Sequence, residues 1–460
     1  MGELINTSAI EGHLSGLHNL SPRKLFPLFP GLTRPLVNYK PDPIWLRDTK
    51  LLPKALQKHR HNARVFAEKE LRPLALKMDA AEHLPAGEIN PELMQLLIKA
   101  GKQGFLSDML PRPLGSVPVV SYSNSIAYYQ AIKVEEFARV CGGTMLLLNA
   151  HNLGIAPILL SGDVSAIRRF VLPAFLESKL GNPHLFAFAI TEPSAGSDVE
   201  DGVGASLYQP RVIAKKVPGG WVLNGRKCFI SGGDIAKSII VFSALEVDGK
   251  REGMESWTPF LVKKTMKGLR VERTELKMGM RASGAAELSF EDVFVPDNHV
   301  IGGLRKGWAI NRAVLNHSRI PVAAMGVGLA QGAVDAATEF VCKTTLVGKP
   351  LIHYQEIQLM IAQMNAETSA IRFMNWKQAE AYAPRQAAAS MCKFHATDRA
   401  VKVCEMAMDL LGNHGVLHDN NVEKCFRDAR LTQIFEGTNQ INRLSVIEDM
   451  QEEFLQKMSK

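Results

Sequence analysis

The chain has 460 residues, of which 46% are hydrophobic and 22% charged, values that are ordinary for a folded globular protein. At one domain per roughly 150 residues, the chain has room for about three domains. Its length and composition exclude a disordered chain, a collagen-like chain and a small disulfide-stabilised domain. Lys and Arg number 54 and Asp and Glu 46, so the net charge is +8. Such a charge can attract anionic ligands, although it most often marks only a solvated face.

Residues 1–47 are predicted to form a Pro-rich, basic extension rather than a domain. Six prolines fall between residues 22 and 43, and each removes a backbone donor and restricts the residue before it, so a continuous helix cannot form. The first 60 residues carry nine Lys or Arg and four acids, a local net charge of 9 − 4 = +5. We expect the apolar residues between the prolines to pack on the protein's own body or on a neighbouring subunit; contact with an anionic membrane surface stays open.

The sequence predicts a cytoplasmic protein. The first ten residues have neither the basic region nor the apolar core of a secretory signal, and the six cysteines form no CxxC pair, which indicates free thiols in a reducing compartment. We expect no transmembrane helix, because the most apolar stretch, 144–160, is interrupted by Asn149, His151 and Asn152. A peripheral position at the inner membrane face or a mitochondrial location stays open.

Residues 48–185 are predicted to form an N-terminal helical domain. The clearest helix begins with Asn90 as N-cap and Pro91 at the first helical position. Apolar residues then recur at positions 93, 96, 97 and 100, the spacing of one helix face, and Gly101 is expected to end the helix. The stretches 61–80, 126–140 and 164–180 also favour helix.

Residues 186–300 are predicted to form a small middle β domain. The sequence changes to a strand period near residue 186, and residues 287–291 alternate cleanly between polar and apolar. Asn224-Gly225 stands between two apolar runs, and this pair suits the positive dihedral angles of a tight hairpin turn. Further strands are expected at 238–247 and 258–264.

Residues 301–460 are predicted to form a C-terminal helical domain, because the helical period returns after Trp308. The order is therefore helical, β, helical, which predicts a mainly α fold with a central β domain. Long helices are expected at 308–342, 354–382, 386–411 and 440–457.

A run of Thr, Ser and Gly, TEPSAGSD at 191–198, follows directly after a predicted strand. Hydroxyls and bare backbone at the end of a strand can approach a planar or phosphorylated ligand, so this run could form a binding loop. The alternative is that it forms only a capped turn without a ligand. The sequence contains neither GxGxxG nor GxxxxGK[ST], so it predicts neither a Rossmann dinucleotide site nor a P-loop.

Six segments, in family order, together resemble the acyl-CoA dehydrogenase family from about residue 50 to the C-terminus. The family's architecture is an N-terminal helical domain, a middle β-barrel or sandwich and a C-terminal four-helix bundle, which agrees with the order predicted from periodicity. The last segment is the most specific. The segments are TEPSAGSD at 191–198, WVLNGRKCFISGG at 221–233, KMGMRAS at 277–283, LNHSR at 315–319, LLGNHG at 410–415 and RDARLTQIFEGTNQINR at 427–443.

The resemblance implies an FAD enzyme that oxidises an acyl-CoA thioester between its α and β carbons to the trans-2-enoyl-CoA. A carboxylate removes the α proton, the β hydrogen leaves as hydride to flavin N5, and the electrons pass to an acceptor of the electron-transfer flavoprotein type. In the family a flavin ribityl hydroxyl and a backbone N–H at the base stabilise the charge that develops on the thioester oxygen. Desolvation is expected to raise the pKa of the base toward what proton abstraction needs.

Glu436 matches the usual base of the family. A minority of its members carry the base just before the Arg of the segment that reads LNHSR here, and that position is Ser318. A serine cannot act as a carboxylate base, so the resemblance assigns the base to Glu436.

The resemblance also implies three sets of binding residues and a homotetramer, a dimer of dimers. The residues that match flavin contacts within one subunit are Thr191, Ser197, Phe229, Ser231, Thr438 and Gln440. Those that match contacts to the neighbouring subunit's FAD are Gln355, Leu411 and Gly412. Those that match residues near the acyl-CoA are Ser197, Asn316, Arg319 and Gly437, and positions 144–148 are expected near the acyl end.

Three departures from the family pattern concern cofactor geometry rather than the base. Thr344 stands where the family usually supplies an Arg to the partner subunit's FAD, and the neighbouring Lys343 would lack the bidentate fork of an Arg. Asn413 replaces a common Gly, and the loop at 110–120 lacks the usual Pro-Glu-x-x-Gly-Gly turn.

The sequence carries little support for a metal site, for nucleic-acid binding or for another flavin reaction. His414 and His418 have no third ligand, so no metal site is expected, and His151 is interpreted as a packing histidine. The pI near 9.1 permits nucleic-acid binding, but no basic domain follows the base segment, so no nucleic-acid partner is expected. An oxidase or monooxygenase of the same fold often lacks the base, while the enoyl-CoA reductase direction stays open. The absence of Arg at 144–148 argues against a dicarboxylate substrate.

Overall fold

The computed structural model describes residues 43–118, 124–197, 208, 210–247, 249–251 and 256–458. The chain divides into two units, Met1–Gln57 and Lys58–Lys460. Most of the predicted extension 1–47, and Asp198 of the TEPSAGSD run, lie outside the described residues. The first unit contains α4 (Ile44–Lys50) and the start of α5 (Lys54–Phe66), and the second unit contains everything that follows.

The second unit begins with helices, as predicted. Asn90 caps α7 by accepting a hydrogen bond from the backbone N–H of Glu92 (2.8 Å), which confirms the predicted start. The helix does not end at Gly101 but runs to Lys102, because Gly101 serves a close approach: a Cβ there would meet the carbonyl oxygen of Ser178 at 2.4 Å. The helices of this part are α6 (Ala75–Asp79), α7 (Pro91–Lys102), α8 (Ile126–Val140), α9 (Gly142–Leu160), α10 (Val164–Ala166) and α11 (Leu172–Lys179).

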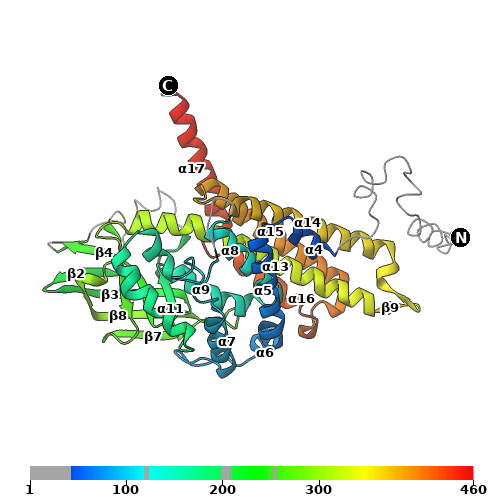
Figure 1. The fold of residues 1–460 in the computed structure, drawn as a ribbon, viewed down its shortest axis with the longest axis horizontal. Helices are drawn as coiled ribbons and strands as arrows, with labels where there is room; N and C mark the ends of the chain where they lie inside the picture. The colour runs from blue at the N-terminus through cyan, green and yellow to red at the C-terminus, as the bar shows by residue number, and fades with distance from the viewer. Residues whose placement is uncertain are drawn as a thin grey trace. The chain divides into compact units, whose positions relative to one another are not determined.

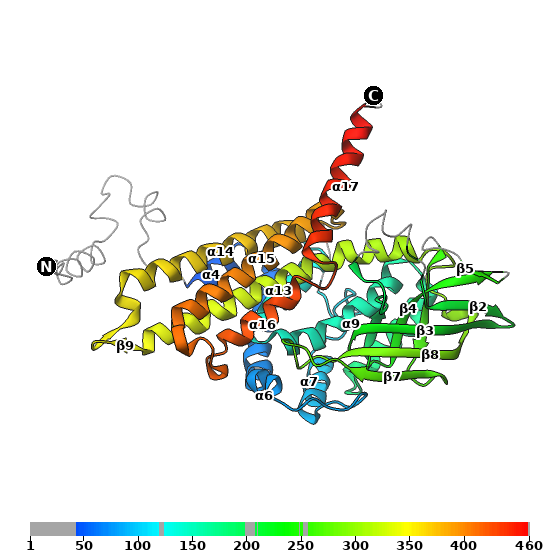
Figure 2. The same cartoon turned by 180° about the vertical axis from the view of Figure 1, so that it is seen from behind.

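An eight-stranded sheet follows, in the order β1-β4-β2-β3-β8-β7, with β5 and β6 both paired to β4. β1 and β2 pair with β4 in parallel, and the other pairs are antiparallel. Figures 1 and 2 show the strands stacked beside α9 and α11. The strands are β1 (Phe186–Ala189), β2 (Ile213–Val217), β3 (Gly220–Ser231), β4 (Ser238–Val247), β5 (Lys250–Arg251), β6 (Thr258–Lys263), β7 (Leu269–Thr274) and β8 (Ala285–Pro296).

The predicted hairpin turn at Asn224-Gly225 is wrong. Both residues lie inside β3, where the register with β8 shifts between Leu223 and Gly225, and Gly225 adopts a φ of 136°. The tight turn instead joins β2 to β3, where Val217 pairs with Gly220. Asn-Gly therefore marks a β-bulge here, because the same positive dihedral angle that suits a turn also suits a bulge.

The C-terminal part is helical, and Figure 2 shows α13, α14 and α15 side by side along their length. α16 was not among the predicted helices, because its short apolar stripe is interrupted by charged residues. The elements are α13 (Gly307–Lys343), β9 (Thr345–Leu346), β10 (Lys349–Pro350), α14 (Gln355–Ala379), α15 (Gln386–Leu411), α16 (Val422–Thr432) and α17 (Asn439–Met458).

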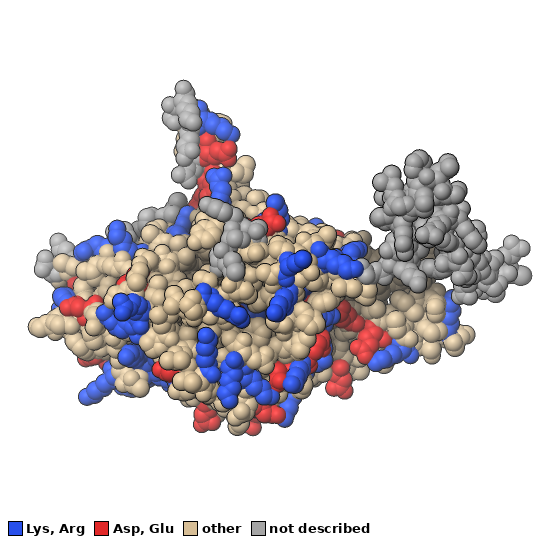
Figure 3. All heavy atoms as spheres, viewed as in Figure 1, with Lys and Arg blue, Asp and Glu red and all other residues tan. Residues whose placement is uncertain are grey.

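Two helices of this unit, α9 and α13, are long and apolar enough to cross a membrane by length and composition. Their apolar windows are 83% and 78% buried within the protein, as in core helices of folded domains. α9 packs against α8, β1 and α13, so it lies between the sheet and the C-terminal helices. On the face shown in Figure 3, basic side chains lie in several separate groups with acidic ones between them, a mixture typical of a solvated surface.

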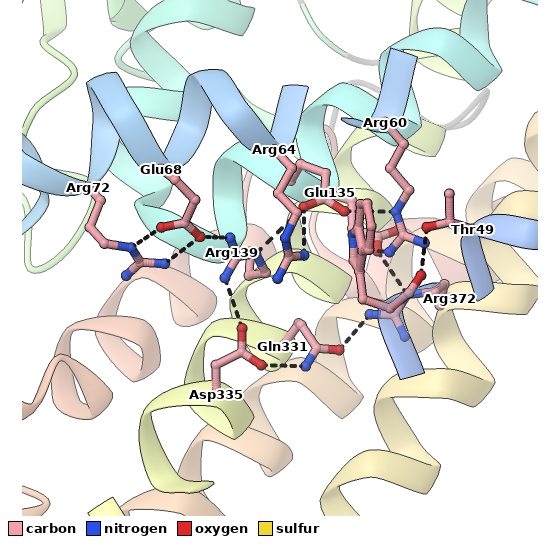
Figure 4. A network of polar contacts seen from close by, with 12 residues as sticks. Thr49, Arg60, Arg64, Glu68, Arg72, Glu135, Arg139, Gln331, Asp335 and Arg372 are labelled. Atoms are coloured by element: carbon pink, nitrogen blue, oxygen red, sulfur yellow. Dashed lines mark hydrogen bonds and ion pairs between the residues drawn. The ribbon is translucent and has the colours of Figure 1, made fainter. Parts of the chain in front are cut away.

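A buried ion network joins the N-terminal helices to the C-terminal ones (Figure 4). Arg60 of α5 pairs with Glu135 (3.0 Å) and Glu136 (2.7 Å) of α8, and Arg372 of α14 pairs with the same Glu135 (2.8 Å). All four side chains are at most 2% exposed. Because an unpaired buried charge is costly, this network ties α8 firmly to its neighbours.

Candidate active site

The turn between α16 and α17 carries Glu436 and Gly437, and both residues adopt left-handed backbone angles, with φ of 56° and 77°. This conformation costs energy for a glutamate, so the surroundings must hold it. Asn442 does so from α17, where its Nδ2 donates to the carbonyl oxygens of Gly437 (2.9 Å) and Thr438 (3.0 Å). The position of the Glu436 side chain is thus fixed by the backbone on which it stands.

A buried lysine on α15, Lys393, holds the same turn from the other side. Its ammonium donates to the carbonyl oxygen of Gly437 (2.7 Å) and to Oδ1 of Asn439 (2.8 Å). Asn439 in turn donates to Asp398 of α15 (2.7 Å). Charged and amide groups therefore fasten the start of α17 to α15.

The carboxylate of Glu436 is partly buried and accepts a hydrogen bond from the hydroxyl of Ser318 on α13, with 2.6 Å between Ser318 Oγ and Glu436 Oε2. Burial raises the pKa of Glu436, while the hydrogen bond from Ser318 and the charges of Arg319 and Lys393 act in the opposite direction. A raised carboxyl pKa brings the group toward the basicity that proton abstraction near neutral pH requires.

Arg319 and Asn316 lie on the same helix as Ser318 but in different surroundings. Arg319 is 3% exposed and donates to the hydroxyl of Ser390 on α15 (2.9 Å), so it lies in the helical interior. Asn316 is only partly buried. Of these two predicted substrate neighbours, Arg319 influences Glu436 through its charge, whereas Asn316 keeps accessible surface.

The loop after β1 meets the Glu436 turn, although the two are 241 residues apart in sequence: the hydroxyl of Ser197 accepts a hydrogen bond from the backbone N–H of Thr438 (2.9 Å). Glu192 anchors this loop, since its buried carboxylate pairs with Lys227 of β3 (2.9 Å). The backbone carbonyl of Thr191 accepts from the N–H of Cys228 (3.0 Å). The structure therefore brings Ser197 into contact with Thr438, two residues after Glu436, from a separate predicted segment, and it ties Thr191 to β3.

The end of β3 carries an unusual aromatic residue. Phe229 has a φ of 56° and a side chain that is 62% exposed, and it stands where the β3–β8 register shifts between Lys227 and Ile230. A large apolar ring held at solvent in a strained conformation is typical of a site that a ligand covers. Ser231 follows two residues later and is partly buried.

The residues predicted to contact the neighbouring subunit's FAD lie away from the Glu436 turn. Leu411 stands 18 residues beyond Lys393 on α15, which is about 27 Å along the helix. Gly412 follows it with a φ of 56°, and the exposed Gln355 begins α14 just after β10. The structure therefore does not bring Gln355, Leu411 and Gly412 to the Glu436 turn of the same subunit.

The side chains that the sequence assigned to the cofactor are suited to a flavin. The exposed ring of Phe229 offers a flat apolar surface for the isoalloxazine, and the hydroxyls of Thr191, Ser197 and Ser231 can exchange hydrogen bonds with its heteroatoms. Gln440 lies exposed in the first turn of α17. Lys343, the possible substitute for the missing Arg, pairs with Glu339 on its own helix.

One cluster of metal-ligand type occurs among the described residues, formed by Asp79, His418 and Glu423. Arg427 donates to the carboxylates of Asp79 (2.5 Å) and Glu423 (2.9 Å). A guanidinium already supplies the positive charge there, so this cluster is an ion-pair network. His151 is confirmed as a packing histidine, because its ring nitrogens bond to the backbone of Leu106 (3.0 Å) and Phe186 (3.1 Å).

Comparison with family models decides the relationship. The N-terminal, middle and C-terminal domains of acyl-CoA dehydrogenase match residues 53–178, 187–293 and 305–451. The chain belongs to the acyl-CoA dehydrogenase family. Members of this family are FAD-dependent flavoproteins, and the protein is accordingly an oxidoreductase that uses FAD.

Its relatives span nearly the whole fold. Cyclohex-1-ene-1-carbonyl-CoA dehydrogenase of Geobacter metallireducens is 35% identical over 385 residues, which cover 83% of this chain and 94% of the relative. Butyryl-CoA dehydrogenase from Megasphaera elsdenii has a similar structure, with a TM-score of 0.77, 28% identity and coverage of 87% of this chain and 98% of that one. A chain from a structure described as the electron transferring flavoprotein of Acidaminococcus fermentans gives a TM-score of 0.75 at 30% identity, with coverage of 87% and 98%.

Sequence reasoning missed the residues that hold the base in place. Lys393 reads as an ordinary charged residue of a helix, and only its place on the apolar face of α15 could have signalled burial. Asn439 and Asn442 lie inside the most specific family segment, yet nothing in their residue types distinguishes a turn clamp from a surface amide. Ser318 was predicted only as a position unable to act as the base, not as the hydrogen-bond donor to it.

Proposed function

We propose that this acyl-CoA dehydrogenase family member catalyses the α,β-dehydrogenation of an acyl-CoA thioester, with Glu436 as the base that removes the α proton. One observation carries the proposal: a carboxylate of raised pKa stands on a clamped turn, hydrogen-bonded to Ser318, where the loop after β1 also arrives. The raised pKa suits this carboxylate to proton abstraction, and the turn gives it a fixed direction.

The chain's own residues prepare this step. The hydroxyl of Ser318 holds one carboxylate oxygen, which restricts the side-chain torsions and leaves Oε1 to meet the proton. Closing the site around an acyl chain would remove water from Glu436 and raise its proton affinity further. The backbone N–H of Glu436 is proposed to donate to the thioester oxygen, where negative charge develops as the proton leaves.

We assign the cofactor and substrate contacts as follows. When bound, FAD supplies the oxidising power and accepts the β hydrogen as hydride. Asn316, Arg319 and Gly437 are proposed to serve the substrate, with Arg319 acting from the interior through Glu436 and Ser197 serving both ligands. The flavin is proposed to be held by Thr191, Ser197, Phe229, Ser231, Thr438 and Gln440.

The assembly is proposed to be a homotetramer, a dimer of dimers, in which Gln355, Leu411 and Gly412 serve the flavin of the neighbouring subunit. Leu411 lies about 27 Å along α15 from Lys393, which supports a role for Leu411 and Gly412 outside their own subunit's site. Domain bounds of 48–185, 186–300 and 301–460 are proposed for the subunit. We further propose cytoplasmic localisation and an electron-transfer flavoprotein as acceptor, the latter supported by the structural similarity to the Acidaminococcus chain.

The proposal is tested by Glu436→Gln, which preserves the shape of the side chain and removes its basicity. The FAD-loaded variant should bind acyl-CoA yet bleach its flavin roughly 100- to 10,000-fold more slowly, which is the contribution of a positioned general base. Glu291→Gln, at an exposed strand position, is the matched control and should bleach normally. A bleaching rate for Glu436→Gln within a few-fold of the parent enzyme would remove Glu436 from the role of base.

A further inference from the structure

A small cavity lies between the N-terminal helices and the sheet. Its volume is about 90 Å³. One water needs roughly 10–15 Å³ on the same measure, so the cavity has room for several waters or for one compact molecule. Its wall is formed by residues 78–93, from the end of α6 to the first turn of α7, by Leu147 of α9, by residues 234–235 after β3, and by residues 274–284 between β7 and β8.

The cavity is separate from the residues assigned above to the base, the thioester and the flavin, since none of them lines it. Of positions 144–148, which the sequence places near the acyl end, only Leu147 does. Leu147 shares a helix face with Gly143, four residues earlier, where a Cβ would meet Ala282 at 3.0 Å. This face of α9 therefore looks toward the connection between β7 and β8.

Several buried polar atoms belong to residues of this wall and lack a hydrogen-bond partner among the described residues. They are Oδ1 of Asp234, Oγ of Ser283 and Oγ1 of Thr274, whereas Oε1 of Glu275 pairs with Arg273 (2.9 Å). Asp234 is 5% exposed and Ser283 is 0% exposed, so bulk solvent does not satisfy them. Because buried polar atoms nearly always have a partner, this group indicates that bound water or another small molecule supplies one.

The carboxylate of Asp234 lies directly over Gly284. A Cβ on Gly284 would meet Oδ2 of Asp234 at 2.5 Å and Oδ1 at 2.7 Å. Gly284 does not have a positive φ, so a larger residue would take away the space over its Cα rather than conflict with its backbone conformation. The carboxylate therefore stands over a glycine that itself lines the cavity.

Lys277 brings an ammonium group to the same cavity. It donates to the backbone oxygen of Ser283, and an ammonium has three N–H donors, so within the described part of the chain it keeps donors for a ligand. Burial lowers the pKa of Lys277 to about 8, while the charge of Asp234 acts in the opposite direction, so Lys277 is mostly protonated at neutral pH. Burial raises the pKa of Asp234, and nearby backbone N–H groups and the charges of Lys264 and Lys277 oppose this increase.

The opposite charges of Asp234 and Lys277 define the polarity of a suitable ligand. Asp234 offers an acceptor and Lys277 offers donors, so the ligand needs a donor and an acceptor side by side. The two charges cancel, so an anionic or cationic ligand would lose its hydration without a net counter-charge in the cavity. The other charged residues of the wall are exposed, so water and salt screen them; they are Glu82, Glu88 and Arg281.

Part of the wall is apolar and buried, which favours a molecule with a short alkyl part over water alone. Met78, Leu93 and Leu147 line the cavity and are 4%, 7% and 3% exposed. Water against these side chains gains no hydrogen bond from them, whereas an alkyl group would cover them.

We propose that this cavity binds a compact neutral molecule with a primary carboxamide at its polar end and a short alkyl part at the other. The amide N–H donates to Oδ1 of Asp234, and the amide oxygen accepts from the ammonium of Lys277. The alkyl part lies against Leu93 and Leu147. The site is additional to the proposed active site and does not depend on the role of Glu436.

The test uses three small molecules of one shape and different charge: propionamide, propionate and propionamidinium. Their binding to the FAD-loaded enzyme is titrated by ligand-observed NMR in the absence of acyl-CoA. Propionamide should bind saturably, with a Kd about tenfold or more below those of the two ions, because each ion would be desolvated without a net counter-charge.

Substitutions locate the binding site. Asp234→Leu and Lys277→Met each remove one polar partner and keep a side chain of similar bulk, so each should raise the Kd of propionamide by about tenfold or more. Gly284→Ala should also weaken binding, because its Cβ would displace the carboxylate without removing a charge. Asp297→Asn, at an exposed position after β8, is the matched control and should bind propionamide like the parent. Thermal unfolding identifies the variants that are folded before binding is compared.

The possible results separate this site from water binding and from the active site. Absence of saturable binding by all three probes would show that the cavity holds only water, and tighter binding of either ion would overturn the neutral class. Propionamide binding that persists in every folded variant would place the ligand elsewhere. Displacement of propionamide by acyl-CoA from the Glu436→Gln holoenzyme would assign it to the active site. Since no readout requires turnover, failure of the dehydrogenase proposal would leave this inference standing.

Discussion

Replacing Ser318 by alanine tests how the protein tunes its proposed base. The substitution removes the 2.6 Å hydrogen bond from Ser318 Oγ to Glu436 Oε2, together with a longer contact from the same hydroxyl to the backbone oxygen of Leu315 (3.3 Å). A hydroxyl that donates to a carboxylate stabilises the ionised form, so its loss must raise the pKa of Glu436 beyond the increase that burial already causes.

The size of the effect follows from the kind of hydrogen bond that is lost. A hydrogen bond to a charged group contributes about 1.5–3 kcal/mol, and about 1.4 kcal/mol corresponds to a tenfold change in proton affinity. The base must be ionised to accept the α proton, so activity falls on the acid side of the pH profile. In Ser318→Ala this acid limb should move to higher pH by about one to two pH units.

The assay is stopped-flow bleaching of the FAD-loaded enzyme by a good acyl-CoA across pH. Ser318→Thr keeps the hydroxyl and is the matched control, and its acid limb should stay close to that of the parent. At high pH the alanine variant should recover most of its rate, since the base is then ionised. An acid limb that stays in place in Ser318→Ala, with normal rates throughout, would refute the idea that this hydroxyl stabilises the ionised base.

Two further substitutions address the framework of the site. Lys393→Met removes the buried ammonium that holds Gly437 and Asn439, so the free energy of unfolding should fall by about 2–3 kcal/mol, seen as a lower melting temperature. Flavin bleaching should slow as Glu436 loses its fixed direction, and unchanged bleaching would show that Asn442 alone holds the turn. Glu135→Gln removes the carboxylate that Arg60 and Arg372 share, while Arg60 keeps its ion pair with Glu136 (2.7 Å). It should cost about 3–5 kcal/mol in chemical unfolding, with an undiminished bleaching rate in the protein that remains folded.

Periodicity predicted the helices and strands wherever the spacing of hydrophobic residues alone determines the secondary structure. α7 and α13 illustrate this, since their apolar residues face a core throughout. Asn224-Gly225 shows where local signals fail: a positive dihedral angle is compatible with a turn and with a bulge, and pairing with β8 selects the bulge. Gly101 failed as a stop signal for a similar reason, because a tertiary contact with Ser178 required a residue without a side chain.

Site residues that lie within the family segments could be predicted from the sequence. Residues whose role depends on a contact in three dimensions could not. Glu436 and the loop with Ser197 lie within such segments, but no sequence pattern indicates that Ser197 and Thr438 meet. Lys393 looks like any helix lysine until its burial is known. The polar interruptions of the apolar stretch 144–160 argued only against a membrane helix, and the structure shows that one of them, Asn152, belongs to a buried cluster with Asp108 and Gln130.

The location of these clamps explains why the base can stand in a costly conformation. Glu436 sits at a left-handed φ on a turn between two helices, and three separate elements restrain it: Asn442 from α17, Lys393 from α15 and Ser318 from α13. Each restraint is a polar group, two of them fully buried, so each needs its partner in place to avoid a desolvation cost. The same interactions that stabilise the strained turn therefore also fix the direction of the carboxylate. A substitution that relaxes the turn should weaken the base even where the carboxylate itself is retained.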